Sequence, residues 1–177
     1  MADVVYSVAS SLDGYIATAD GGIEWLTPYQ SAGEDYGYAE FYASVQAVVM
    51  GRQTYEQAEG FGKWPFDGKP ALIFSHHSLH VPFPDASATS AAPADALRDL
   101  EQRGLSRVWL VGGGELAGSF RREGLINEYL VTFIPVLLGA GVPLFAPPGP
   151  QEQLALTGTR SFPNGVVQLR YLRGDSA

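Results

Sequence analysis

The sequence contains no cysteine, and this absence removes disulfide bonds, thiolate catalysis and cysteine-ligated zinc together. The only three histidines are His76, His77 and His80, and no carboxylate stands next to them in the chain, so we expect no metal site. No apolar run approaches the roughly 18 residues that a membrane span requires. Because no basic segment precedes the first apolar run, we expect a cytoplasmic protein that has no membrane partner.

Basic residues are scarce, since 11 lysines and arginines stand against 19 aspartates and glutamates, which gives a net charge of -8. They are scattered along the chain and form no stripe that could displace counterions from a nucleic acid, so we expect no nucleic-acid partner. A bound phosphate needs only one or two local positive groups or the N-terminus of a helix. The net negative charge of the chain therefore does not exclude a cofactor that carries phosphate.

The chain has the length and composition of one well-packed domain. Its 177 residues are enough for one core and few for two, and 46% of them are hydrophobic. The 21 glycines and 12 prolines indicate many tight connections. We find no internal repeat and no linker, and therefore expect a single domain over residues 1–177.

Short apolar runs alternate with segments of helical spacing. Residues 163–165, Pro-Asn-Gly, are a strong hairpin signal, and residues 82–92 have the composition of a surface connection. The order of these segments predicts an α/β fold of three layers, with a mostly parallel central sheet, helices on both faces and an antiparallel C-terminal hairpin. The expected strands are residues 4–9, 15–17, 47–50, 71–74, 108–111, 129–138, 154–162 and 166–172, and the expected helices are 34–44, 53–59, 93–103 and 115–123.

Three consecutive glycines, residues 112–114, follow the expected strand at 108–111 and precede a helix that starts at Glu115. Glycine lets the backbone approach a ligand closely, and the helix directs its free N–H groups and its dipole to the same place, so the pattern favours an anion site. A turn that serves only helix packing is the alternative. The run also matches G-x-G-x-x-G/A, but a Rossmann domain is disfavoured because no acid lies between Glu128 and Glu152.

A second glycine ends the strand at residues 47–50. Gly51 clears space there, and Arg52 and Thr54 stand at the start of the next helix, where a phosphate is favoured. The alternative is a helix cap with a surface arginine.

Four segments taken together resemble the dihydrofolate reductase-like superfamily. They resemble more closely the reductase domain of the bifunctional riboflavin-biosynthesis deaminase/reductase and its small stand-alone relatives. The segments are Ser-Leu-Asp-Gly-Tyr-Ile-Ala at 11–17, Val-Val-Met-Gly-Arg-Gln-Thr-Tyr-Glu at 48–56, the glycine turn after 108–111, and Pro-Val-Leu-Leu-Gly-Ala-Gly-Val-Pro-Leu-Phe at 135–145. Their order and spacing carry the resemblance, which spans residues 4–145.

The resemblance implies NADPH as cofactor. Ser75 and His76 end the strand at 71–74, where similar proteins place polar groups around the adenosine 2′-phosphate, and this favours NADPH over NADH. Simple exposure of the histidines is the alternative. The cofactor-binding residues implied are Ala9, Ala17, Gly51, Arg52, Gln53, Thr54, Ser75, His76, Gly112, Gly113, Gly114, Glu115 and Leu116.

The resemblance also places a catalytic carboxylate at Asp35 and its hydroxyl partner at Thr132. On a helix, Asp35 would share a face with Tyr38 and Tyr42, and we expect desolvation there to raise its pKa. A solvated residue at a helix N-terminus is the alternative, and Glu34 and Glu40 are the reserve carboxylates. The expected substrate-binding residues are Asp13, Trp25, Tyr38 and Phe41, although a plain turn would explain Asp13 and a core role the aromatics.

These features predict an NADPH-dependent oxidoreductase that transfers hydride to a small heterocyclic substrate of the riboflavin-pathway type, similar to 5-amino-6-ribosylaminouracil. A dihydrofolate reductase is the alternative enzyme, but Ala39 stands where those enzymes carry a large apolar residue. An NADPH-binding module without turnover is the alternative outside enzymes. The resemblance also implies a homodimer.

Overall fold

The computed structural model describes residues 2–30 and 33–174. One sheet of eight strands has the order β5-β4-β3-β6-β1-β7-β10-β9, and β2 pairs with β8 in a small second sheet. In chain order the strands are β1 (Asp3–Ser11), β2 (Tyr15–Ala17), β3 (Ala47–Gly51), β4 (Ala71–Phe74), β5 (Ala86–Thr89), β6 (Arg107–Gly112), β7 (Glu128–Ile134), β8 (Val142–Pro143), β9 (Leu154–Ser161) and β10 (Val167–Arg173). The helices are the 3-10 turn η1 (Glu24–Leu26), α1 (Thr27–Gln30), α2 (Tyr38–Ser44), α3 (Arg52–Glu59), α4 (Pro93–Gln102) and α5 (Gly114–Arg122).

The main sheet is parallel from β5 to β7 and antiparallel at β10 and β9. The register aligns Tyr6 of β1 with Leu110 of β6 and with Tyr129 of β7. The prediction of a mostly parallel sheet that ends in an antiparallel hairpin is confirmed. Helices on both faces explain why the central strands are nearly continuous apolar runs, since such strands are buried on both sides.

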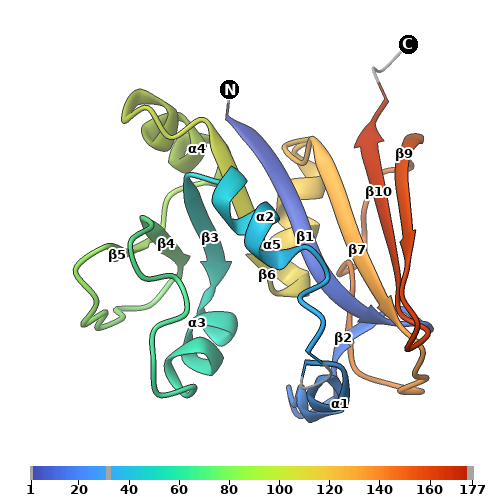
Figure 1. Cartoon of the computed structure of the whole chain (residues 1–177). Helices are drawn as coiled ribbons and strands as arrows, with labels where there is room; N and C mark the ends of the chain where they lie inside the picture. Colours follow the sequence, from blue (N-terminus) through green and yellow to red (C-terminus); the bar gives the residue numbers. More distant parts are fainter. Residues whose placement is uncertain (1, 31–32, 175–177) are drawn as a thin grey trace.

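Each face of the sheet has its own core. Leu97 of α4 and Phe120 of α5 pack on one face together with Tyr6. Tyr55 of α3 packs on the other face with Met50, and α2 covers the same face. Figure 1 shows α2 crossing in front of the sheet while α5 lies behind it. The three expected layers are therefore present, and strand ends at the lower edge in this view point toward the starts of α3 and α5.

Several expected boundaries were wrong. The helix expected from residue 34 begins at Tyr38, because Gly37 takes a left-handed conformation at φ 76°. The strand expected to continue to residue 138 ends at Ile134, before Pro135, whose ring removes a donor from the ladder. β5 lies inside the segment expected to be a surface connection and pairs in parallel with β4, because tertiary pairing overrides its weak strand propensity. Within the described residues, the helices are too short and too polar for any of them to traverse a lipid bilayer.

Candidate active site

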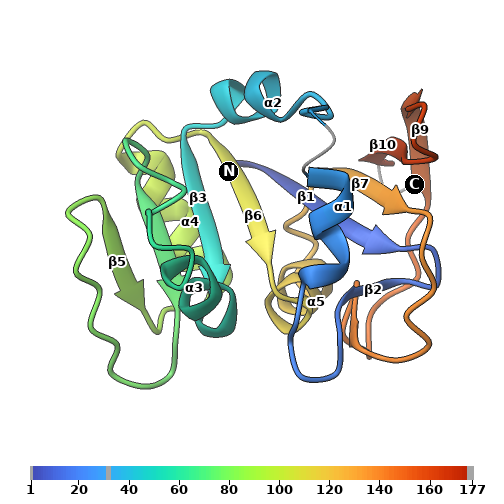
Figure 2. The same cartoon turned by 60° about the horizontal axis from the view of Figure 1, so that its bottom comes forward.

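The two glycine turns meet at one edge of the sheet. β3 and β6 are neighbours, and their register places Met50 beside Gly112, so Gly51 and the turn at residues 112–114 leave the sheet side by side. Figure 2 shows α3 and α5 beginning next to each other at the arrowheads of β3 and β6. In open α/β sheets, ligands bind at the carboxyl ends of the strands, at the point where the order of the strands reverses.

Both helices begin without a side-chain cap. The N-cap residues are Gly51 for α3 and Gly113 for α5, and both have extended backbone dihedrals. The first N–H groups of the two helices therefore lack the side-chain acceptor that usually satisfies them. Two such ends, each with the positive end of a helix dipole, form a place where an anion with several oxygen atoms can accept hydrogen bonds.

The glycines of these turns are not equivalent. Gly112 has φ 133°, a conformation that only glycine adopts readily, and a Cβ on Gly114 would overlap the carbonyl oxygen of Pro143. Gly113 has φ -78°, and its Cβ would make an ordinary contact of 3.6 Å with Thr54 Oγ1. Gly51 is similar, because its Cβ would lie 3.7 Å from the nitrogen of Gly113. Conformation and packing thus explain Gly112 and Gly114, whereas at Gly51 and Gly113 neither the φ angle nor the space around a Cβ requires glycine. The peptide bond between Gly112 and Gly113 is cis.

The other expected cofactor residues surround this edge. Arg52, the first residue of α3, forms an exposed ion pair with Glu56 one turn further along the helix, with 2.6 Å between Nε and Oε1. The charge of the Arg52 guanidinium is therefore already partly neutralised. Ser75 follows β4, the neighbour of β3, and its hydroxyl donates to the carbonyl of His77 at 2.8 Å, while His76 is exposed. Gln53 and Thr54 lie in the first turn of α3, and Glu115 and Leu116 lie in the first turn of α5.

Ala9 and Ala17 lie on the neighbouring strands. Ala9 of β1 is aligned with Thr132 of β7, and Ala17 of β2 is buried and aligned with Val142 of β8. The pairing of β2 with β8 holds the segment after β1 against the segment that follows β7. Ala9 and Ala17 therefore flank the edge that the glycine turns form, although only Ala9 belongs to the main sheet.

Asp35 differs from its expected setting. It is exposed and precedes α2, and its two carboxylate oxygens accept hydrogen bonds from the nitrogens of Gly37 at 2.8 Å and Ala39 at 3.3 Å. These bonds stabilise the charged form, so the pKa of Asp35 is lowered, chiefly by Gly37 and then by Ala39. The expectation of a raised pKa is wrong, because the helix begins only after Gly37 and leaves Asp35 exposed to solvent ahead of it.

Thr132 has a partner that the sequence did not suggest. Gln168 of β10 is aligned with Thr132, and its Nε2 donates to Thr132 Oγ1 at 3.0 Å and to the carbonyl of Tyr36 at 3.3 Å. Among the described residues Asp35 and Thr132 share no hydrogen bond, but one glutamine side chain links Thr132 to the residue next to Asp35. Only the register of β10 against β7 reveals Gln168, so no local signal could have found it.

Asp13 holds two loops together. Its carboxylate accepts hydrogen bonds from the Ser11 hydroxyl at 2.6 Å and from the nitrogens of Leu138 at 3.1 Å and Gly139 at 2.7 Å. The Ser11 bond is the main reason that the pKa of Asp13 is lowered, and the two backbone donors add to it. A structural role therefore accounts for Asp13, while a role in binding substrate stays a prediction.

The expected aromatic walls lie on α2 and η1. Tyr38 and Phe41 make edge contacts with the Trp109 ring, at centroid distances of 5.9 and 5.2 Å, so α2 is fixed to β6 on this face. Trp25 is half-buried in η1, and its indole nitrogen is buried without a hydrogen-bond partner among the described residues. Gln57 of α3 donates to the carbonyl of Gly21, which draws the loop before η1 toward α3.

No group of three or more histidine, aspartate or glutamate side chains that could hold a metal ion occurs in residues 2–30 and 33–174.

Comparison with known proteins adds a family to this geometry. The model of the RibD C-terminal domain matches residues 2–168. The chain is 38% identical to the uncharacterised protein YwjB of Bacillus subtilis, over 96% of this chain and 97% of YwjB. It is 27% identical to the riboflavin biosynthesis protein RibD of Corynebacterium ammoniagenes, over 82% of this chain but only 46% of RibD.

Solved structures agree with the family match. A Shewanella sp. PV-4 protein, whose name places it provisionally in riboflavin biosynthesis, superposes with a TM-score of 0.88 at 30% identity, over 99% of this chain and all of that one. A deaminase/reductase of Thermotoga maritima superposes with a TM-score of 0.75 at 14% identity, over 98% of this chain and 57% of that one, and this likeness concerns the fold alone. The predicted dihydrofolate reductase-like fold is confirmed, and the chain belongs to the RibD C-terminal domain family.

Proposed function

We propose that the protein is an NADPH-dependent reductase that transfers hydride to a small heterocyclic substrate of the riboflavin-pathway type. The observation that carries this proposal is the pair Gly51 and Gly113, which face each other at two uncapped helix N-termini. The folded chain has room for a Cβ at both positions, so the space that the glycines leave open suits a ligand rather than the fold. A dinucleotide pyrophosphate has the size and charge for this place.

The residues around the two turns fit NADPH. Backbone N–H groups of α3 and α5 would hold the pyrophosphate, and Ser75 and His76 at the end of β4 would lie toward the 2′-phosphate. When bound, the cofactor supplies the hydride. The chain's own contribution is to hold the nicotinamide near Ala9 and to exclude water with the loop that Gln57 draws toward α3.

Asp35 and Thr132 are the proposed catalytic pair, but the chemistry that suits Asp35 differs from proton donation. The C=N or C=O group must be protonated before it can accept hydride, and a carboxylate with a lowered pKa stabilises the positive charge of that protonated group at neutral pH. The proton then comes from water. Gln168 donates hydrogen bonds both to the Thr132 hydroxyl and to the carbonyl of Tyr36, next to Asp35, so Gln168 is a positioning residue in this proposal.

The riboflavin-type substrate is proposed from the family and from the names of its relatives. RibD proteins of Corynebacterium ammoniagenes and Mycobacterium tuberculosis are more than twice as long as the segment matched here, which covers 46% and 44% of them. A substrate of the same chemical class, an amino-substituted pyrimidine with a sugar whose C=N or C=O bond is reduced, suits a reductase of this fold. We also propose a homodimer, which light scattering of the purified protein would detect.

Thermal melting with NADPH, NADH, FMN and dihydrofolate tests the proposal. NADPH at 100 times its dissociation constant should add about 2.7 kcal/mol to the free energy of unfolding, which raises the melting temperature by roughly 5–10 °C in a chain of this size. NADH should give a smaller rise. Absence of any rise with NADPH would contradict the proposal.

Assays of NADPH oxidation distinguish the riboflavin-type reductase from the two alternative functions. NADPH oxidation with a ribosylaminopyrimidine supports the riboflavin-type reductase, whereas rapid oxidation with dihydrofolate would identify a dihydrofolate reductase instead. NADPH binding with no oxidation by any pyrimidine or pterin would favour the binding module.

A further inference from the structure

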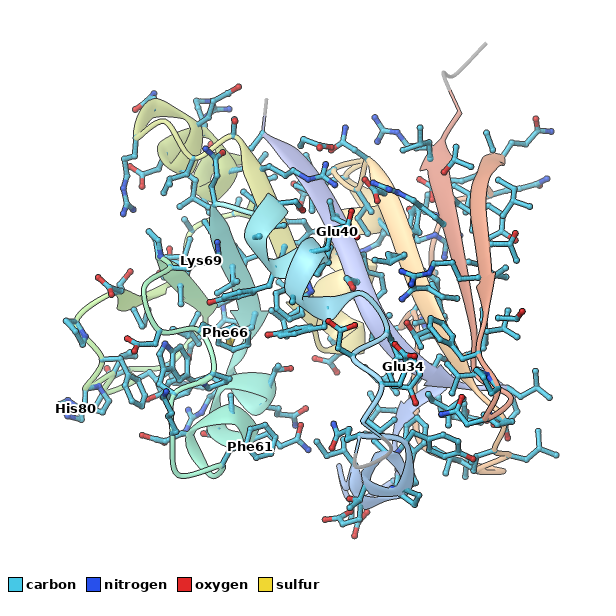
Figure 3. The ribbon with its side chains drawn as sticks, in the orientation of Figure 1. Glu34, Glu40, Phe61, Phe66, Lys69 and His80 are labelled. Atoms are coloured by element: carbon cyan, nitrogen blue, oxygen red, sulfur yellow. The ribbon has the colours of Figure 1, made fainter. Side chains whose placement is uncertain are left out.

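A cavity lies on the sheet beside α2. It has a volume of about 450 Å³, within the range of small-molecule sites. Its walls come from one side of α2 and from strands β6, β7, β10 and β9, and none of its lining residues belongs to α3 or α5. In Figure 3, Glu40 on α2 lies on the side toward β7, whereas Phe66 lies on the opposite side of α2 beside β3. The cavity therefore lies apart from the edge that the two glycine turns form, but it adjoins the proposed catalytic pair, because Phe41 and the Gln168 side chain that holds Thr132 both line it.

Positive charge gathers in this cavity. Arg107, Arg160 and Arg170 line it, which is three of the 11 basic residues in a chain whose net charge is -8. Two of them face Glu128, a carboxylate that is only 3% exposed: Arg107 Nη2 lies 2.9 Å from Oε2, and Arg170 Nε lies 2.6 Å from Oε1. Burial alone would raise the pKa of Glu128, but the two guanidinium groups outweigh it and lower the pKa, so this acid stays charged.

Arg160 is the arginine of this cavity that forms no ion pair among the described residues, although its charge also helps to lower the pKa of Asp35. Its guanidinium carbon lies 5.2 Å from the centre of the Phe162 ring, and Arg160 takes part in none of the ion pairs within the described segments. Gly37 makes room for it, because a Cβ there would lie 2.6 Å from Arg160 Nη1. A guanidinium that is stacked on an aromatic ring and weakly hydrated binds oxyanions well.

The rest of the wall is suited to an organic molecule rather than a bare ion. Phe41 and Leu130 supply apolar surface, and Gln168 and the hydroxyl-bearing residues Thr157 and Thr159 supply polar groups. We propose that this cavity is a second small-molecule site, which binds a small organic anion with its charged group on Arg160 and its apolar part on Phe41 and Leu130. Glu40 at the opposite wall disfavours a ligand of high negative charge, so we expect a monoanion or dianion.

Phenyl phosphate is the probe for this site, because it joins one phosphate to one apolar ring. It would be titrated by calorimetry into the full chain without cofactor, with benzyl alcohol as the uncharged control. We expect saturable binding of phenyl phosphate, no binding of benzyl alcohol, and at least tenfold weaker binding of phenyl phosphate to Arg160→Gln. Arg160 is exposed, so Arg160→Gln should melt within about 2 °C of the native chain.

Two matched variants make the test decisive. Arg52→Gln removes a cation at the start of α3, and Arg98→Gln removes an exposed cation of α4 that pairs with Asp95. Both should bind phenyl phosphate within twofold of the native chain. The proposal is overturned by the absence of saturable binding, by loss of binding in Arg52→Gln with retention in Arg160→Gln, or by equal weakening in all three variants. None of these outcomes depends on NADPH, so the proposed reductase function stands or fails separately.

Discussion

Replacement of Gly114 by alanine should destabilise the protein, whereas the same change at Gly113 should not. A Cβ on Gly114 would lie less than 3.0 Å from the carbonyl oxygen of Pro143, a separation that real Cβ atoms do not show. That oxygen is backbone, and the segment is fixed further because the nitrogen of Ala146 donates to the carbonyl of Gly114 at 3.2 Å. Overpacking of this kind costs about 1–3 kcal/mol.

The matched change at Gly113 has opposing small effects. Alanine is a poorer N-cap than glycine by roughly 0.5–1 kcal/mol, and it reduces the entropy of the unfolded chain by a similar amount, about 0.4–1 kcal/mol. Gly113→Ala should therefore melt within about 2 °C of the native chain, and Gly114→Ala should melt roughly 4–8 °C lower. Circular dichroism during heating measures both. Equal melting temperatures for the two variants would refute the argument that Pro143 fixes the turn.

Three further variants test other contacts. Asp13→Asn should weaken the hydrogen bonds that Leu138 and Gly139 donate to this side chain. The pKa of Asp13 is lowered in the folded protein, so its stabilising effect is complete above the unfolded pKa of about 4 and is lost as the pH falls further. The stabilities of the native chain and the variant, measured by acid titration, should therefore converge at low pH. Glu128→Gln should lower the free energy of unfolding by about 2 kcal/mol at pH 7, as measured by urea unfolding. The difference should shrink in acid because the pKa of Glu128 is lowered in the folded protein. A constant difference from pH 7 to pH 3 would exclude the charge of Glu128 as its cause. Asp35→Asn should slow NADPH oxidation with a melting temperature close to native, and an unchanged rate would remove Asp35 from the mechanism.

The parts of the fold that could be predicted from the sequence are those with strong local signals. The buried runs that became β3 and β6, the glycine turns after them and the Pro-Asn-Gly hairpin all depend on neighbouring residues. β5 was missed because Ala86–Thr89 carries little apolar pattern and forms a strand only through its pairing with β4. The start of α2 was missed because a single left-handed glycine, Gly37, places the start of the helix four residues later than expected.

The candidate site likewise contains features that local sequence predicts and features that depend on contacts distant in sequence. The two glycine turns that form the proposed phosphate site could be predicted, because glycine, strand end and helix start are adjacent in the chain. Gln168 was missed because its partner, Thr132, is distant in sequence and is met only through the register of β10 against β7. The direction of the Asp35 pKa was wrong for a related reason, since it depends on two backbone donors whose positions follow from where α2 begins.

The central claim is that Gly51 and Gly113 leave space for the pyrophosphate of NADPH, and calorimetric titration of NADPH into the native chain and into Gly113→Ala tests it most directly. The native chain should bind NADPH, and Gly113→Ala should bind it at least tenfold more weakly, a loss of about 1.4 kcal/mol, while its melting temperature without ligand stays near native. No binding of NADPH by the native chain, or equal affinity of the two proteins, would contradict the claim.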